Sequence, residues 1–267
     1  MKKLAVLVLS SALTCLASAQ TLSNYQFIVT SQGPTTYFKL DSSLQSSVDP
    51  SVVLTPYAFQ VGGFAADIFR NPNLSYFFSG QSDYLLNNTT NLINGGGTTN
   101  TTSTAAGSIA FLFRTLDPGQ NTGQRFLFSA GNVTANGNAL SLFLENTNVA
   151  NGDPNSLKLR FGNTTTTILQ ASNIVPNTWY YFALTYLESR VPNKAIWYVG
   201  RAGASLSSGT TTNSAEAVAG DGVSGLVIGN NEGLNNSFRN PGSGQIDEFA
   251  IWNRELTLTE INTQFGN

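Results

Sequence analysis

Short apolar segments recur along most of the chain, and their pattern indicates β-strands. Apolar residues alternate with polar ones or run continuously over strand length, and Gly, Pro, Asn or Ser closes each segment. No long stretch has the 3.6-residue period of an amphipathic helix. The predicted strands are YQFIV (25–29), TYFKL (36–40), SYFF (75–78), SIAFLFR (108–114), RFLFSA (125–130), ALSLFL (139–144), LKLRF (157–161), TWYYFALTYL (178–187), KAIWYV (194–199), GLVIG (225–229) and QIDEFAIW (245–252). Many short strands separated by turn residues predict an all-β, two-sheet antiparallel jelly-roll sandwich.

Two predicted strands are apolar on both faces. In SIAFLFR, Ile109, Phe111 and Phe113 share one face, and Ala110 and Leu112 share the other. TWYYFALTYL likewise carries aromatic residues on each face. We therefore expect both strands in the middle of a sheet. The Asn-, Thr- and Ser-rich segments 87–107, 205–222 and 230–244 are predicted loops.

The last predicted strand contains two neighbouring acids, Asp247 and Glu248. On a regular strand adjacent side chains point to opposite faces, so we expect Asp247 on the face of Phe249 and Ile251 and Glu248 on the other face. The two carboxyl groups could then not act on one substrate atom. A buried carboxylate needs hydrogen-bond donors or a cation, so loop amides and a Ca²⁺ ion both remain open for Asp247.

A short helix is predicted after this strand. Thr257 and Glu260 have the spacing of a capping box, and Leu256 and Ile261 stand where a hydrophobic staple would lie. We expect a helix over about 258–264 that covers an edge of the sandwich.

The first residues, MKKLAVLVLSSALTCLASAQ, resemble a secretory signal peptide. A basic pair precedes an apolar run and the sequence Ala17-Ser18-Ala19, which predicts a leader over 1–19, cleavage near Ala19 and a single domain over 20–267. The apolar run is shorter than a membrane span requires. We therefore expect a secreted protein, extracellular or periplasmic, without a membrane span.

Composition excludes several classes of chemistry. The chain has no histidine, and its one cysteine, Cys15, lies in the predicted leader. Disulfides, Cys/His zinc sites and Ser-His or Cys-His nucleophiles are thereby excluded from the mature chain. Charged residues make up only 10% of the chain, with 13 basic and 15 acidic side chains, so no basic stripe for nucleic acid is expected.

The run G-x-I-D-E-x-x-I-W-N-R-x-L-T-x-x-E-I over Gly244 to Ile261 resembles the closing motif of laminin-G-like domains, which have the concanavalin A-like jelly-roll fold. Segments resembling other motifs of this family occur upstream in the expected order: FFSGQSDYLL (77–86), GSIAFLFRTL (107–116), RFLFSAG (125–131), NTWYYFALTY (177–186), KAIWYVG (194–200) and GLVIGNN (225–231). Gly200-Arg201 replaces the Asn-Gly that usually forms one hairpin. The resemblance spans nearly the whole mature chain.

This resemblance implies a secreted protein that binds glycans or extracellular proteins. Many relatives hold one Ca²⁺ ion near the aspartate of the closing motif and N-terminal loop residues. By position, the resemblance implies Asp247 and Asp49 as metal ligands, with Asp83 ranked behind them.

We favour a non-catalytic binding module that serves carbohydrate binding or extracellular adhesion, with carbohydrate as the expected ligand. A glycoside hydrolase on the same fold would need two acids on one face of a strand, and the sequence has no E-x-D-x-E pattern. A structural surface or matrix component is the third hypothesis. Trp179, Trp197 and Trp252 all fall in predicted strands, so we expect them in the core rather than as sugar platforms.

Overall fold

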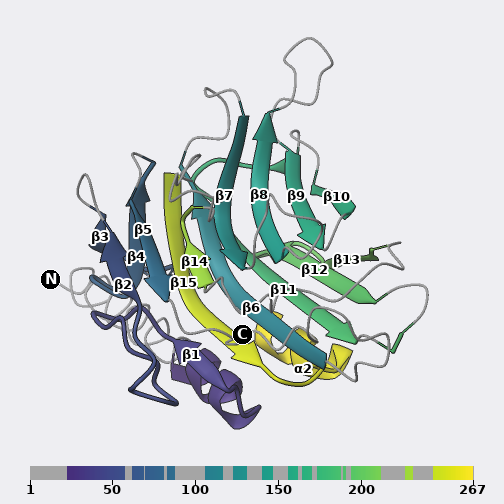
Figure 1. Cartoon of the computed structure of the whole chain (residues 1–267), viewed down its shortest axis with the longest axis horizontal. Coiled ribbons are helices and arrows are strands. Elements are labelled where there is room, and N and C mark those ends of the chain that lie inside the picture. The colour runs from purple at the N-terminus through teal and green to yellow at the C-terminus, as the bar shows by residue number, and fades with distance from the viewer. Residues whose placement is uncertain are drawn as a thin grey trace, which may run out of the picture.

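A computed structural model shows two antiparallel β-sheets packed face to face (Figure 1). The structure describes residues 23–57, 62–68, 70–80, 83–87, 106–116, 123–130, 140–146, 156–161, 164–169, 173–187, 189–190, 194–211, 226–230 and 243–266. Within these ranges almost all secondary structure is strand, with helices only near the two ends. The predicted all-β sandwich with a short C-terminal helix is confirmed. No helix in the described ranges is long and apolar enough to cross a bilayer.

The first sheet has eight strands. Its order is β13 (Ser207–Thr210), β12 (Ala195–Arg201), β11 (Trp179–Leu187), β6 (Ala106–Thr115), β15 (Ser243–Trp252), β4 (Ser75–Ser79) and β3 (Gly63–Ala65). The eighth strand, β1 (Thr36–Phe38), pairs with the second half of β15, whereas β4 pairs with its first half. One edge of β15 therefore changes partner near its middle.

The second sheet has seven strands. Its order is β10 (Thr164–Leu169), β9 (Ser156–Phe161), β8 (Leu140–Asn146), β7 (Gly123–Ala130), β14 (Leu226–Ile228), β5 (Tyr84–Asn87) and β2 (Thr55–Tyr57). The strands β7 to β10 form consecutive hairpin pairs, whereas β14 and β5 come from distant parts of the chain.

Aromatic rings from both sheets fill the space between them. Phe111 on β6 packs against Phe182 on β11 and Phe249 on β15, with ring centroids 5.3 and 5.1 Å apart. From the opposite sheet, Phe128 on β7 meets Phe111 edge to face at 5.4 Å. All four side chains are fully buried. The predicted faces of β6 and β11 are thus confirmed, since their other faces belong to a separate apolar cluster.

That separate cluster lies on the outer face of the eight-stranded sheet, under two helices. One helix spans residues 23–31 and contributes Tyr25 and Val29; it is drawn in purple beside β1 in Figure 1. The other is α2 (Leu258–Phe265), whose Ile261 is fully buried and whose Phe265 packs on Tyr181 of β11. The expected helix is confirmed, but it covers the face of a sheet rather than an edge.

The predicted strand over residues 25–29 is wrong, because this segment is part of the helix 23–31. Tyr25 and Val29 stand at i and i+4, the spacing of one helix face, and both are buried, whereas Phe27 points away and is 73% exposed. The predicted loop 205–222 also needs correction, since it contains the edge strand β13, which pairs with β12. Of the predicted loops 87–107 and 230–244, all but the terminal residues 87, 106, 107, 230, 243 and 244 lie outside the described residues.

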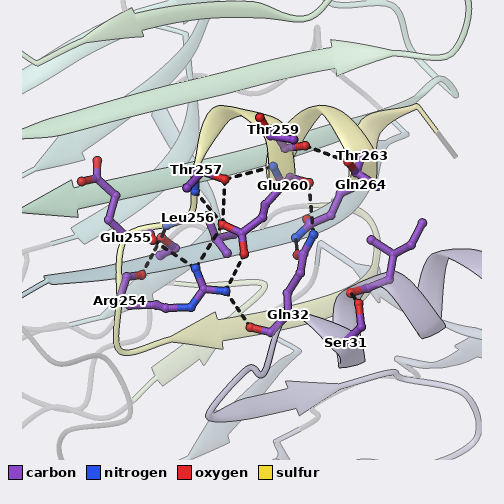
Figure 2. A network of polar contacts seen from close by, with 12 residues as sticks. Ser31, Gln32, Arg254, Glu255, Leu256, Thr257, Thr259, Glu260, Thr263 and Gln264 are labelled. Carbon is purple, nitrogen blue, oxygen red and sulfur yellow. Dashed lines mark hydrogen bonds and ion pairs between the residues drawn. The ribbon is translucent and has the colours of Figure 1, made fainter.

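Polar contacts connect the end of the helix 23–31 to Arg254 and α2 (Figure 2). Thr257 and Glu260 form the predicted capping box at the beginning of the helix. Arg254 donates two hydrogen bonds to the Glu260 carboxylate, at 2.6 and 3.1 Å, and a third to the carbonyl of Gln32, just after the helix 23–31, at 2.7 Å. The Gln264 amide in turn donates to the Gln32 side chain. The two helices are therefore fixed to each other over the sheet.

Candidate functional site

The acids Asp247 and Glu248 lie on a β-bulge in the middle of β15. Between Asp247 and Ala250, β15 advances three residues while its partner β6 advances two, from Leu112 to Ala110. Glu248 has a φ angle of 56°, which is rare for a residue other than glycine. The bulge falls where the other edge of β15 changes partner from β4 to β1.

The bulge overturns the predicted placement of the two acids on opposite faces. Asp247 stands opposite Leu112, which belongs to the outer apolar cluster, and Glu248 contacts Tyr37 of the same cluster. Phe249 belongs instead to the core between the sheets. One extra residue inverts the alternation, so both carboxyl groups point to the outer side of the sheet.

Glu248 is fully enclosed but well hydrogen-bonded. It accepts a hydrogen bond of 2.7 Å from the Gln26 amide, on the helix 23–31, and another from the Tyr37 hydroxyl, on β1. Its exposed fraction is 1%. Burial raises the pKa of this carboxyl to about 7, although the two hydrogen bonds act in the opposite direction.

Asp247 is also fully buried, and neither of its carboxyl oxygens has a hydrogen-bond partner of standard geometry. Burial, the neighbouring Glu248 and the carboxylate of Asp67 raise its pKa well above the ordinary value, with a smaller contribution from Asp41. The nearby backbone N–H of Glu248 acts in the opposite direction, but the pKa stays well above its ordinary value. An orphaned carboxyl group in such a position is either protonated or paired with a cation.

Asp67 and Asp41 enter this neighbourhood from two segments that adjoin β15. Asp67 follows β3 and is 3% exposed; it accepts hydrogen bonds from the backbone and side-chain N–H groups of Asn71 at 2.7 and 3.0 Å. Asp41 lies three residues after β1. Gln245, two residues before Asp247, donates to the carbonyl of Ala66 at 3.0 Å and so holds the Asp67 loop against β15.

Of the other sequence-predicted ligands, Asp49 lies in an exposed turn. Its carboxylate accepts hydrogen bonds from the N–H and hydroxyl of Ser51 at 3.0 and 2.6 Å, which lower its pKa. Asp83 is 1% exposed, and its carboxylate accepts from the N–H and hydroxyl of Ser79 at 2.6 and 2.7 Å. No contact joins Asp49 or Asp83 to Asp247 among the hydrogen bonds of the described residues.

The unpartnered carboxyl group of Asp247 and its acidic surroundings would suit a hard cation. The two unpartnered, buried oxygens of Asp247 are ligands of the type that Ca²⁺ prefers, and the acidic surroundings would favour a positive charge. In the described part of the chain, no three Asp, Glu, His or Cys side chains gather in a metal-binding arrangement. Backbone carbonyls and water would therefore have to complete the coordination.

Sequence reasoning missed Asp41, Asp67, Gln26 and Tyr37 as neighbours of the acid pair. The one sequence signal for Tyr37 is that it lies in the predicted strand 36–40. For Asp67 and Asp41 no local pattern exists, because their position depends on which strands pair with β15.

The three tryptophans are buried as predicted. Trp179 and Trp197 are each 9% exposed and Trp252 is 1% exposed. None of them presents a ring face to solvent, so an exposed aromatic surface must come from other residues.

The structure has a shallow pocket of ≈ 230 Å³ at the edge formed by β10, β12 and β13. Its lining includes Leu169, Asn173, Tyr180 and Arg201. The Tyr180 hydroxyl is already engaged, since it donates to the carbonyl of Asn173 and accepts from the N–H of Val175. The volume is below the roughly 300–1,000 Å³ of typical small-molecule sites.

Residues 80–262 match the concanavalin A-like lectin/glucanases superfamily. The match covers more than half of the chain, so the chain belongs to this superfamily. No curated protein matches the sequence.

Solved structures with the same fold include domain 4 of AbnA, an extracellular arabinanase of Geobacillus stearothermophilus, in complex with arabinotriose. It is 14% identical, with a TM-score of 0.55 over 86% of this chain and 97% of that domain. The ligand-binding domain of botulinum neurotoxin serotype D, in complex with N-acetylneuraminic acid, is 13% identical, with a TM-score of 0.54 over 88% of this chain and 51% of that one. The serotype G binding domain is 15% identical with a TM-score of 0.56 over 88% of this chain. The present chain spans about half the length of the neurotoxin domains. At these identities the likeness establishes the fold alone.

Proposed function

We propose that this protein is a secreted, non-catalytic carbohydrate-binding module. The superfamily to which the chain belongs is named for both lectins and glucanases, so the question is which of the two activities this chain supports. The arabinanase domain and the serotype D neurotoxin domain were both solved with sugars bound, which favours a glycan as the ligand.

The observation that carries the non-catalytic assignment is the complete burial of Asp247 and Glu248. Glycoside hydrolysis places the scissile bond between two carboxyl groups, about 5 to 10 Å apart, with access for substrate and water. Here the two acids are 0% and 1% exposed, under the helix 23–31. A polysaccharide cannot reach them unless that helix is displaced, together with the hydrogen bonds from Arg254 and Gln264 to Gln32 at its end.

The burial of the pair instead gives it a structural role. Gln26 and Tyr37 donate to Glu248, so the acid attaches both the helix 23–31 and β1 to the bulge of β15. The helix 23–31, near the beginning of the predicted mature chain, is therefore part of the fold. The predicted cleavage near Ala19 would leave this helix intact, and mass spectrometry of the secreted protein tests that position.

Ca²⁺ bound through Asp247 is part of this proposal, with Asp49 as the second ligand that the family resemblance implies. The support is the unpartnered, buried carboxyl group of Asp247. A cation that binds only the folded state would stabilise it by RT ln(1 + [Ca²⁺]/Kd), so the stabilisation grows with the logarithm of the Ca²⁺ concentration above Kd. The melting temperature of the wild-type protein should rise when Ca²⁺ replaces chelator, and that rise should be absent in Asp247→Asn. An equal rise in both proteins would remove Asp247 from the metal site, and no rise in either would remove the metal.

Binding to immobilised polysaccharides tests the function directly. We expect the purified mature protein to be retained on at least one of arabinan, xylan, laminarin, galactomannan and dextran, and to release no reducing sugar from any of them. Lack of retention on the whole panel would contradict the glycan ligand. Release of reducing sugar would contradict the non-catalytic assignment.

A further inference from the structure

Two tyrosine rings stand in parallel at one edge of the seven-stranded sheet. Tyr57 on the edge strand β2 is paired in register with Tyr84 on β5. Their ring centroids are 5.1 Å apart and the ring planes differ by only 2°. Tyr84 belongs to a small apolar cluster with Leu86 and Val227, separate from the core between the sheets, so both rings stand on the outer face.

The two rings differ strongly in exposure. Tyr84 is 7% exposed, whereas Tyr57 is 45% exposed. Because Tyr84 covers one face of the Tyr57 ring, the exposed part of Tyr57 consists of the opposite face and the ring edge. Phe126 and Phe143, further along the same sheet face, are fully buried and so differ from Tyr57, whose ring is exposed.

The Tyr57 ring is also held in place by its neighbours. Tyr84 supports it from behind, and Pro56 restricts the backbone beside it. Burial, followed by the proximity of Tyr57, raises the pKa of Tyr84 to about 12, so the supporting ring stays neutral at physiological pH. A flat, supported ring requires little ordering when a ligand binds.

We propose that the exposed face of Tyr57, backed by Tyr84, is the platform on which a sugar ring of the glycan stacks; this inference rests on the proposed carbohydrate-binding function. The face of an aromatic ring is negative, so it attracts the slightly positive C–H groups that cover one face of a pyranose or furanose. The sugar hydroxyls point outward in the plane of the sugar ring. Thr55 is exposed on the same side of β2, and its hydroxyl can bond them.

This surface suits a chain of sugars better than an isolated small molecule. The platform lies on the edge strand of the described sheet, which suits a polymer that runs past it in both directions. The described strands end at β2, which leaves that side of Tyr57 without a further strand of the sheet.

Three single substitutions separate stacking from a purely structural role. Tyr57→Phe keeps the flat ring and loses only the hydroxyl. Tyr57→Leu keeps an apolar cover over Tyr84 but has no aromatic face. Phe27→Leu removes an exposed aromatic ring, 73% exposed, from the helix on the other sheet and serves as the matched control.

Affinity electrophoresis in gels containing arabinan, xylan, laminarin, galactomannan or dextran measures the binding of each variant. For the polysaccharide that binds the wild type, we expect Tyr57→Leu to bind about tenfold more weakly, and Tyr57→Phe and Phe27→Leu to stay within about threefold. The melting temperatures of all variants are measured in parallel, and Tyr57→Leu should match the wild type closely.

The other possible results would contradict either the Tyr57 platform alone or the proposed function as well. Wild-type binding with undiminished binding by Tyr57→Leu, or with an equal loss in Phe27→Leu, overturns the Tyr57 platform and leaves the proposed function intact. Absence of wild-type binding to all five polysaccharides overturns the proposed function and the platform together.

Discussion

Replacing Glu248 by glutamine should change how the stability of the protein depends on pH. The pKa of this carboxyl is about 7 in the folded protein and 4.5 in its ordinary state. The folded protein therefore keeps the proton to a higher pH than the unfolded chain does. The stabilisation from Glu248 is fully present below pH 4.5 and is lost as the pH rises through 7.

The size of this effect follows from the pKa difference. One pKa unit corresponds to ~1.4 kcal/mol, so the free energy of unfolding should fall by about 3 kcal/mol between roughly pH 4.5 and 7.5 because of this one group. Glutamine is neutral at every pH in that range. Its carbonyl can accept from the Tyr37 hydroxyl, and the Gln26 amide can turn to present its own carbonyl, so the contacts of the site are largely kept.

The effect is measured by urea unfolding at pH 5 and at pH 8. Tryptophan fluorescence monitors the unfolding, and chelator is present throughout. We expect Glu248→Gln to lose less stability between the two pH values than the wild type, by about 2 to 3 kcal/mol. Asp247, whose pKa is also raised, supplies the dependence that remains.

Glu260→Gln is the matched control. Its carboxyl has a pKa of about 2 because of Arg254, so it is ionised in both the folded and unfolded states at pH 5 and above. This variant should keep the wild-type difference between pH 5 and pH 8. Equal pH dependence in the wild type and Glu248→Gln would refute the burial of an ionisable Glu248.

Three further substitutions test the architecture by the same unfolding measurement. Thr257→Ala removes the side chain that caps α2 and should cost about 1 kcal/mol of stability; an unchanged urea midpoint would mean that the capping box with Glu260 contributes nothing. Phe111→Ala opens a cavity among the core rings and should cost about 3 to 5 kcal/mol, and a loss below about 1 kcal/mol would contradict the core position. Gly229→Ala should destabilise because Gly229 has a φ of +87° and a Cβ there would lie 2.3 Å from the Phe78 ring; wild-type stability would show that this turn is wrongly placed.

Most of the sandwich could be predicted from the sequence because its central strands are apolar on both faces. Alternation in β6 and β11 correctly separates Phe111 and Phe182, which face the other sheet, from Leu112 and Tyr181, which face the helices. The strands that were missed are short or rich in Ser, Thr, Gly and Pro. Examples are β10, with the sequence TTTTIL, and β2, with TPY. Their strand structure comes from pairing at sheet edges rather than from an apolar face.

The helix 23–31 shows why a short apolar segment is ambiguous. Tyr25, Phe27 and Val29 alternate as in a strand, yet Tyr25 and Val29 also fit one face of a helix. The choice is made by tertiary contacts, since Gln26 reaches Glu248 only from the helical form seen here.

The acid pair could be found in the sequence, but its geometry could not. Alternation places Asp247 and Glu248 on opposite faces, and only the bulge brings both to the same side. Bulges depend on how neighbouring strands pair, and here β15 meets β4 and β1 along one edge. The same pairing brings in Asp67 and Asp41, which no local motif connects to the closing strand.

Comparison of the wild type with the double variant Asp247→Asn/Glu248→Gln on a bound polysaccharide tests most directly whether the acid pair is structural. If both acids are sealed within the fold, the two proteins bind the polysaccharide with the same affinity, and neither releases reducing sugar. Sugar release by the wild type that disappears in the double variant would contradict this and would make the pair catalytic.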